Sequence, residues 1–300
     1  MWATLSGLQS QTLPPLETIL VDAGGNRSVE PAEGTLGAKG VPVRTLRAED
    51  AYPGGARNAG VIAARGDWIA FIDCGMVPNE RWLEELVATV GRTGDRAVLG
   101  VTEYLPTTDF QRSLCAVSTG FHPIPVLPAS LFHRSVFDEV GLFRCDMRGG
   151  EDQEWLRRVR NKLGVVPIAR SARTTYQDLP NDLATVVWKW KLYAEHFVRG
   201  QVRPGQQAAY LAAVPILAVL AWAAPALVPV AFLGYLVGRV VLRPIRLGAQ
   251  ASWLRHPRNL GRTACLAVIL DVAKWGGFLL GWLNEPVRRL GPRCAGTGGR

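Results

Sequence analysis

A long stretch without charge lies in the last third of the chain and limits what the chain can fold into. Ala208–Gly238 contains no charged residue. The stretch is too long for one ordinary membrane span, and Pro225 and Pro229 interrupt it near its middle. The sequence therefore predicts two short membrane-anchoring helices, at about 207–224 and 226–242, joined by a tight turn.

A third apolar segment follows at about 264–283. It carries Asp271 and Lys274, which would stand one helical turn apart and could pair on one face of a helix. Such a segment either crosses a membrane or lies in its interface. The basic tail after it favours a segment that returns to its starting side or lies flat.

Arginines flank the first apolar stretch on both sides. Two precede it and six follow it: Arg199 and Arg203, then Arg239, Arg243, Arg246, Arg255, Arg258 and Arg262. A hairpin would leave both groups in the cytoplasm, as the positive-inside rule requires, whereas a single crossing would export the second group. We therefore expect a multi-pass or hairpin anchor in the cytoplasmic (inner) membrane, with the remaining domain in the cytoplasm.

The charge balance favours anionic partners. The formal net charge is +9 and the pI is about 9.7, but no RRM-like aromatic pattern, zinc-finger spacing or Lys-rich tail indicates nucleic acid. The positive charge gathers around the apolar segments, which indicates membrane lipids. Five scattered cysteines without a CxxC pair suit a reducing cytosol, and the N-terminus lacks the pattern of a signal peptide.

Strands and helices alternate in the first part of the chain. We expect strands at 16–21, 41–46, 68–72, 97–105 and 165–168, a short strand that begins at 131, and helices at 56–65, 79–90, 135–140, 151–160 and 183–197. This order predicts an α/β domain over 1–200 with a mostly parallel sheet, followed by membrane-anchoring helices and a basic tail over 201–300. The proline-rich 106–129 segment is expected to be an irregular surface loop over the ligand site.

Acidic residues stand where an α/β sheet binds its ligand. Asp22 and Asp73 each follow a predicted strand, and ligands bind at the carboxyl ends of such strands. Glu151 and Asp152 follow two glycines at a predicted helix start. The alternatives are structural: Asp22 could only begin a turn, and the two helix acids could only stabilise the helix dipole.

Four sequence elements, in order, resemble the inverting family 2 glycosyltransferases with the GT-A fold. They are Ile-Leu-Val-Asp22-Ala-Gly-Gly-Asn, which is similar to "VVDDGS"; Gly-Gly-Ala-Arg57-Asn-Ala-Gly, followed by Trp-Ile-Ala-Phe-Ile-Asp73; Gly141-Leu-Phe; and Gly150-Glu-Asp152. The resemblance covers roughly 8–200, and the membrane-anchored tail is similar to that of many bacterial members. It implies a Rossmann-like GT-A domain.

The resemblance also implies a reaction. Members move a sugar from a nucleoside-diphosphate sugar to an acceptor hydroxyl, here of a lipid-linked or envelope glycan at the cytoplasmic membrane face. It assigns the catalytic base to Asp152, and Asp22 would bind the base or ribose. Arg57 would bind base or phosphate oxygens, or remain a solvated surface residue. Glu151 would face the site, and Trp155 could stack on the acceptor or simply pack in the core.

The same resemblance implies a divalent cation, Mg²⁺ or Mn²⁺, at an Asp-x-Asp motif. Asp73 matches the first acid, but Gly75 stands where the main metal-binding acid is found. We find no well-placed histidine after the Glu-Asp element. Asp73 could therefore bind ribose, or bind the cation with water and phosphate completing its shell.

One family element is absent. Members begin with a strand of the type "VSVVIPxYN", whereas this chain begins inside the following helix. Either the start was assigned late, or part of the base pocket is missing, and the late start is the better explanation because losing a central strand would leave backbone groups unpaired. The missing strand and Gly75 leave a second function open, that of a non-catalytic relative that binds sugar nucleotides or acts as a scaffold.

Overall fold

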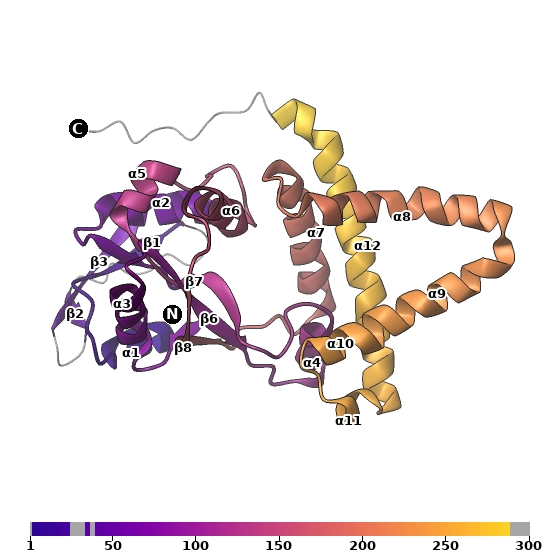
Figure 1. Cartoon of the computed structure of the whole chain (residues 1–300), viewed down its shortest axis with the longest axis horizontal. Helices are drawn as coiled ribbons and strands as arrows, with labels where there is room; N and C mark the ends of the chain where they lie inside the picture. Colours follow the sequence, from indigo (N-terminus) through magenta and orange to yellow (C-terminus); the bar gives the residue numbers. More distant parts are fainter. Residues whose placement is uncertain (1, 25–33, 37–39, 289–300) are drawn as a thin grey trace. The chain divides into compact units, whose positions relative to one another are not determined.

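The computed structural model describes residues 2–24, 34–36 and 40–288 (Figure 1). The basic tail beyond residue 288 and the Gly25-Asn26 pair of the first motif lie outside the described residues. The chain divides into two compact units. Within the described residues, the α/β unit contains those up to Glu103 together with Pro123–Tyr176, and the helical unit contains Tyr104–His122 and 177–288.

Two sheets form the α/β unit. One has the order β1-β3-β2, and the other β4-β7-β6-β8-β5. Their strands are β1 (Thr18–Asp22), β2 (Gly34–Leu36), β3 (Val41–Arg47), β4 (Trp68–Ala70), β5 (Met76–Pro78), β6 (Ala97–Tyr104), β7 (Ile124–His133) and β8 (Ile168–Tyr176). The pair β1–β3 is parallel, whereas β2–β3, β4–β7, β5–β8 and β6–β7 are antiparallel.

The α/β class is confirmed, but the sheet is mixed rather than mostly parallel. The antiparallel partners are longer than the predicted strands or shifted from them. Strand β7 contains the short strand predicted from 131 but begins inside the predicted 106–129 loop, and β8 begins where the predicted 165–168 strand ends. Without the full length of these two strands the pattern of strand, helix and strand resembled a parallel crossover fold.

The helices of the α/β unit match the predicted positions more closely. They are α1 (Trp2–Gln9), α2 (Pro53–Ala63), α3 (Trp82–Thr93), α5 (Arg134–Val140) and α6 (Glu151–Leu163). Helix α2 begins earlier than predicted because Pro53 takes the first-turn position, where its missing N–H costs no hydrogen bond. Helix α3 begins at Trp82, because Met76–Pro78 forms β5 instead of a helix start.

The 106–129 segment is not irregular, as expected from its prolines, but contains helix α4 (Asp109–Val117). Its start is a reciprocal cap. The Gln111 backbone N–H donates to Thr108 Oγ1 at 3.2 Å, and the Thr107 backbone N–H donates to Gln111 Oε1 at 2.8 Å. A Thr followed three residues later by Gln is a recognised start signal, so this helix could have been predicted.

The helical unit contains helices of four to 32 residues in addition to α4. They are α7 (Leu183–Arg199), α8 (Pro204–Ala223), α9 (Val228–Leu236), the π-helix η2 (Val237–Leu242), α10 (Arg243–Arg246), α11 (Ala251–Leu254) and α12 (Pro257–Arg288). Three described segments are long and apolar enough to cross a membrane: Pro204–Ala223, Pro225–Arg246 and Pro257–Asn284. The prediction of three apolar helices is therefore confirmed, with α7 and α4 packed beside them instead of belonging to a 1–200 domain.

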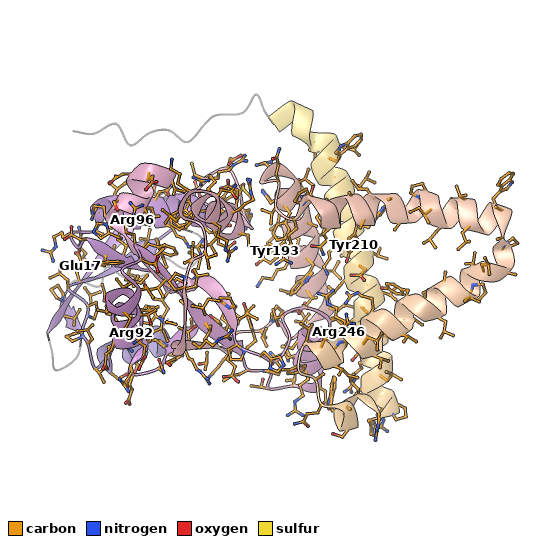
Figure 2. All side chains as sticks on the ribbon, viewed as in Figure 1. Glu17, Arg92, Arg96, Tyr193, Tyr210 and Arg246 are labelled. Atoms are coloured by element: carbon orange, nitrogen blue, oxygen red, sulfur yellow. The ribbon has the colours of Figure 1, made fainter. Side chains whose placement is uncertain are left out.

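The hairpin of α8 and α9 differs from α12 in its surroundings. Neither α8 nor α9 has a buried residue, and their side chains project to both sides of the hairpin (Figure 2). Helix α12 instead runs beside α7 (Figure 1). Two glycines allow this close approach: a Cβ on Gly277 would overlap the Lys191 carbonyl oxygen, and one on Gly281 would lie 2.6 Å from the Glu195 carbonyl oxygen.

The α7–α12 contact gives a testable prediction. Gly277→Ala should lower the free energy of unfolding by about 1–3 kcal/mol, because the new methyl group overlaps the backbone of α7. Gly276→Ala is the matched control, because a Cβ there meets no atom within 4 Å and alanine favours helix by up to about 1 kcal/mol. Thermal unfolding of the detergent-solubilised protein measures both, and equal behaviour of the two variants would contradict the close packing.

Candidate functional site

A buried arginine joins three segments of the α/β unit. Arg57 lies in α2, and its side chain is only 12% exposed. One terminal nitrogen donates to Asp73 Oδ1 at 2.8 Å, in the loop after β4, and the other donates to Glu151 Oε1, at the start of α6. The alternative of a solvated surface arginine is therefore wrong, and the structure brings together three of the predicted site residues.

The residues around Arg57 fix α2 against the loop that leads into α6. A Cβ on Gly54 would overlap the Arg144 carbonyl oxygen, so only glycine permits this approach. The Asn58 side-chain amide makes two hydrogen bonds with the Phe143 backbone. Asn58 Nδ2 donates to the Phe143 carbonyl oxygen at 2.9 Å, and the Phe143 N–H donates to Asn58 Oδ1 at 2.9 Å. The Arg57 guanidinium lies 5.9 Å from the centroid of the Phe143 ring. The Gly-Gly-Ala-Arg-Asn motif thus holds α2 against the loop that leads into α6.

Asn58 is a positioning residue that the sequence analysis did not select. It lies inside the quoted motif, directly after Arg57. Its amide satisfies both backbone groups of Phe143, and this fixes the path of the chain before the acids of α6. The signal that could have identified it is the side-chain type: a buried asparagine can bond a donor and an acceptor at once.

The acids of α6 lie at a helix start. Gly150 adopts a φ of 80°, which favours glycine, and α6 begins at the next residue. Glu151 is buried, whereas Asp152 is partly exposed and so can be reached by a ligand. Three acids in the first turn of α6 face the positive end of the helix dipole. Stabilisation of the dipole, the structural alternative, is therefore compatible with a role of these acids at the site.

The electrostatics of this group depend on burial. Burial raises the pKa of Glu151 and of Asp152 above the ordinary range, and the Arg57 charge offsets this only in part. Burial also lowers the pKa of Arg57, but the charges of Asp73, Glu151 and Asp152 outweigh it and raise that pKa above its ordinary value. Arg57 therefore stays charged, while three carboxyl groups share its single positive charge.

Asp22 lies at the carboxyl end of β1, as predicted, and is buried. Its Oδ1 accepts a hydrogen bond of 3.0 Å from the Gly24 backbone N–H. This contact is the turn role that the sequence analysis gave as the alternative. Binding of a base or ribose by Asp22 stays a prediction.

The assignment of Trp155 to the acceptor is wrong. Its side chain is fully buried in an aromatic cluster of the core. The Trp155 ring stacks on Phe137 at 5.0 Å and lies 4.6 Å from the Phe143 ring centroid, and its Nε1–H donates to the Gly141 carbonyl at 2.8 Å. With the indole N–H satisfied and the ring covered, no face remains for a substrate.

Gly75 has a structural reason. Its φ is 93°, in the left-handed region that L side chains rarely adopt, and its N–H donates to Thr4 Oγ1 of α1 at 3.1 Å. An aspartate at this position would be strained. The described residues contain no group of three or more His, Cys, Asp or Glu side chains that could hold a metal ion, and Asp73 is engaged with Arg57. These residues do not form a preformed cation centre.

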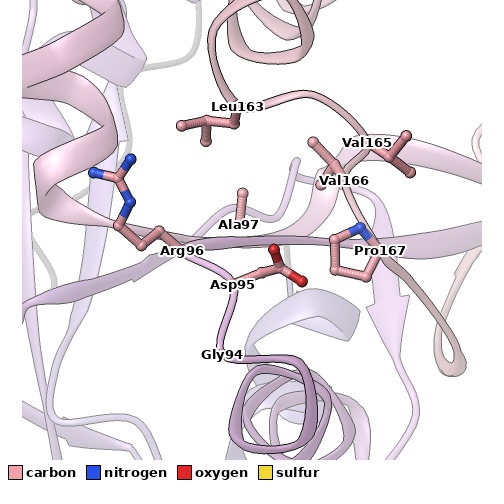
Figure 3. Close-up of a pocket in the computed structure, with 8 residues that line it drawn as sticks. All are labelled: Gly94, Asp95, Arg96, Ala97, Leu163, Val165, Val166 and Pro167. Carbon is pink, nitrogen blue, oxygen red and sulfur yellow. The ribbon is translucent and has the colours of Figure 1, made fainter.

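A hollow of about 170 Å³ lies elsewhere in the α/β unit (Figure 3). It is lined by residues before and at the start of β6 and by the loop between α6 and β8, namely Gly94, Asp95, Arg96, Ala97, Leu163, Val165, Val166 and Pro167. None of the predicted site residues lines it. Arg96 is already paired with Glu139 at 2.7 Å, so the hollow does not compete with the Arg57 group as the candidate site.

Comparison with known proteins places the first part of the chain. The family model described as glycosyl transferase family 2 matches residues 1–141. Residues 1–141 belong to glycosyl transferase family 2. This family 2 region contains Asp22, Arg57 and Asp73, and it ends before Glu151 and Asp152. Arg57 nevertheless joins the matched region to the acids of α6, which lie outside it.

Curated relatives are similar over about a third of the chain. Hyaluronan synthase of Pasteurella multocida is 32% identical over 107 residues, which is 35% of this chain and 11% of that protein. Pre-mycofactocin glycosyltransferase of Mycobacterium tuberculosis is 30% identical over 115 residues, 33% of this chain and 24% of that protein. The chain therefore matches less than a quarter of the length of these relatives.

Solved structures of TarS from S. aureus also align with the chain. The structure of its residues 1–349 in complex with UDP-GlcNAc aligns with a TM-score of 0.44 and 13% identity, over 67% of this chain and 62% of that one. A second TarS structure aligns with a TM-score of 0.38 and 15% identity, over 64% of this chain and 36% of that one.

The raised pKa of Asp152 predicts a stability effect. In the unfolded chain this carboxyl ionises at its ordinary value, so at neutral pH the folded protein carries the cost of a charge that burial disfavours. Asp152→Asn should therefore raise the melting temperature at pH 7. The gain should vanish as the pH falls below the ordinary aspartate value, where both states are protonated.

Asp67→Asn serves as the matched control, because Asp67 is exposed and its replacement should leave the melting temperature unchanged. Melting curves of the three proteins from pH 3 to pH 8 make the comparison. An Asp152→Asn protein that is less stable than the unsubstituted one at pH 7 would contradict the assigned direction.

Proposed function

We propose that the chain is an inverting glycosyltransferase that moves a sugar from a nucleoside-diphosphate sugar to an acceptor hydroxyl. The family 2 region supports the reaction class. The observation that carries the proposal is the Arg57 group: one buried guanidinium ties the loop after β4 to the start of α6, where Asp152 is partly exposed and has a raised pKa. Carboxylates with raised pKa values suit general base catalysis.

In the proposed reaction Asp152 acts as the base. Its carboxylate accepts the proton of the acceptor hydroxyl while that oxygen forms a bond to the anomeric carbon of the donor sugar. The bond between the anomeric carbon and the diphosphate oxygen breaks in the same step, and the nucleoside diphosphate leaves with the bonding electrons. Because attack and departure occur on opposite faces, the configuration inverts.

Arg57 has two roles in this proposal. Burial raises the pKa of Asp152, and the Arg57 charge opposes this rise, which favours the ionised form that can act as a base. Arg57 also holds Asp73 and Glu151 by charge-assisted hydrogen bonds, so the loop after β4 and the start of α6 are fixed before a donor arrives. Preorganised charge of this kind costs no rearrangement during the reaction.

The divalent cation stays a prediction. Asp73 is the acid of the loop after β4 that could offer an oxygen ligand, and Mg²⁺ often takes one carboxylate together with phosphate oxygens and water. Bound there, the cation would neutralise charge on the departing diphosphate. Melting temperatures measured with UDP, with and without Mn²⁺, for the unsubstituted protein and Asp73→Asn would show whether Asp73 contributes.

We further propose that the α8–α9 hairpin anchors the chain in the inner membrane, with the transferase domain in the cytoplasm. The hairpin is apolar and has no buried residue in its α-helices, and arginines stand at both of its ends. Helix α12 packs along α7, which carries Lys191 and Glu195 at that contact. This supports an α12 that lies in the interface, because a crossing α12 would draw those charges into the membrane.

A membrane-bound transferase fits an acceptor that is itself membrane-linked, such as a lipid-linked or envelope glycan. The alternative function is a relative that binds sugar nucleotides without transfer. Gly75 supports this alternative, because glycine offers no carboxylate where the second metal-binding acid of the family stands. Binding of UDP without turnover against UDP-, GDP- and dTDP-sugars would favour it.

The proposed base gives the principal prediction. Asp152→Asn should lower kcat by about 10²–10⁴-fold, the usual contribution of a general base, and should leave UDP binding unchanged. Asp67→Asn, an exposed aspartate of the same unit, should retain full activity. Release of UDP in the presence of donor and acceptor measures turnover, and normal turnover in Asp152→Asn would remove this residue from the mechanism.

The pH dependence gives a second prediction. Asp152 must be ionised to accept a proton, so kcat/KM should fall as the pH drops through its raised pKa, at a higher pH than for an ordinary aspartate. Arg57→Gln removes the charge that lowers this pKa and should move the acid limb to higher pH. Arg57→Lys retains the charge and should move it less. An acid limb that is the same in all three proteins would contradict the assignment.

A further inference from the structure

A polar cluster lies within the apolar helices of the helical unit. Asp271 of α12 accepts four hydrogen bonds from the hairpin. Arg239 donates to both carboxylate oxygens, at 2.6 Å and 2.8 Å, while the hydroxyl groups of Tyr210 and Tyr235 donate at 2.6 Å and 3.0 Å. A carboxylate has about four acceptor sites, so Asp271 is fully occupied.

Lys274 adds a second positive charge to this cluster. Its Nζ lies 3.5 Å from Asp271 Oδ1 and 6.0 Å from the centroid of the Tyr210 ring, and its side chain is only 12% exposed. The predicted pairing of Asp271 with Lys274 is therefore confirmed. With Arg239 and Lys274 beside a single carboxylate, the buried cluster carries a net positive charge of one.

Arg243 raises the net positive charge of the cluster from one to two. It begins α10, directly after the π-helix η2, and follows Arg239 by about one helical turn. It is partly buried, and no carboxylate of the described residues lies within ion-pair distance of its guanidinium. Asp271 already accepts four hydrogen bonds, so the cluster holds more cationic donors than this carboxylate can accept.

The depth of the cluster is set by the hairpin. From Tyr210 to the end of α8 and from the start of α9 to Arg239, each arm rises roughly 15–20 Å at about 1.5 Å per residue. This is less than the roughly 30 Å hydrocarbon core of a bilayer. A hairpin whose tip lies near the middle of the bilayer therefore places the tyrosines and arginines of the cluster near the headgroup layer of the leaflet it enters, where these residue types are favoured.

We propose that Lys274 and Arg243, supported by Arg239 and the two tyrosines, form a binding site for a phosphate group. Surplus positive charge at low dielectric needs an anion, and the phosphate groups of membrane lipids lie at this depth. Arginine offers a fork of donors that matches phosphate. Arg239 lies in a π-helix, and π-helical turns are frequently found at functional sites. This supports a functional role for the cluster.

This proposal rests on the insertion of the hairpin and not on sugar transfer. A purely structural role is the alternative, in which the Asp271 contacts only fasten the hairpin to α12. The bidentate pair of Arg239 with Asp271 already does this. Arg243 makes no such pair, so its substitution separates ligand binding from fastening.

The test measures lipid binding to the full-length protein in neutral detergent micelles by native mass spectrometry. The probes are dioleoyl phosphatidic acid, inorganic phosphate and, as the uncharged control, dioleoylglycerol. Arg243→Gln should weaken phosphatidic acid binding about tenfold, the effect of losing one charge-assisted contact. Arg246→Gln is the matched control, because it removes the same charge from an exposed position of the same helix (Figure 2) and should change the affinity less than twofold.

Binding of phosphatidic acid but not of inorganic phosphate supports a lipid phosphate as the ligand, and the reverse supports a soluble phosphate. Two results would overturn the proposed phosphate site. One is that neither phosphatidic acid nor inorganic phosphate binds. The other is that Arg243→Gln and Arg246→Gln weaken phosphatidic acid binding equally, which would indicate diffuse surface charge. Flotation of the protein with phosphatidylcholine vesicles tests insertion separately. Loss of UDP-sugar turnover with intact phosphate binding would count against the transferase proposal alone.

Discussion

The Arg57 guanidinium is the interaction on which the α/β unit depends at its site. It is nearly buried, and a buried charge is tolerated only with partners. Its partners are Asp73 and Glu151, from two segments that are far apart in the sequence. Removing Arg57 would leave the buried Glu151 carboxyl without its partner, which costs far more than a surface pair contributes, whereas the Asp73 side chain is about half exposed. The Arg57 charge also offsets in part the rise that burial causes in the pKa of Asp152.

The loop after β4 shows why a family pattern can change without loss of the fold. Position 75 has a positive φ and donates its N–H to Thr4, so glycine is the residue that fits. The acid that is usual there in the family is absent, and Asp73 instead bonds to Arg57. Any cation bound here would depend on the phosphates of its ligand for most of its coordination, so the guanidinium is the positive charge that the protein itself supplies.

The helical unit repeats this principle in another setting. Asp271 accepts hydrogen bonds from Arg239 and two tyrosines where the hairpin meets α12, while residues 211–234 of the hairpin carry only apolar side chains. Burial of a carboxylate among apolar helices requires this saturation with donors. The excess positive charge at the same place distinguishes the cluster from one that only holds the hairpin against α12. It favours the proposed binding of an anion that the described residues do not provide.

The sequence by itself determined the α/β class, the apolar hairpin and the positions of Asp73, Arg57 and the Glu151-Asp152 pair, because these depend on local pattern: short apolar runs, turn glycines and the absence of charge. Tertiary structure decided what local pattern cannot. The antiparallel partners β7 and β8, the burial of Trp155 among phenylalanines and the ion pairs of Arg57 all join residues distant in sequence. Strand direction and side-chain burial are set by such long-range contacts, since the period of a strand is the same in either direction.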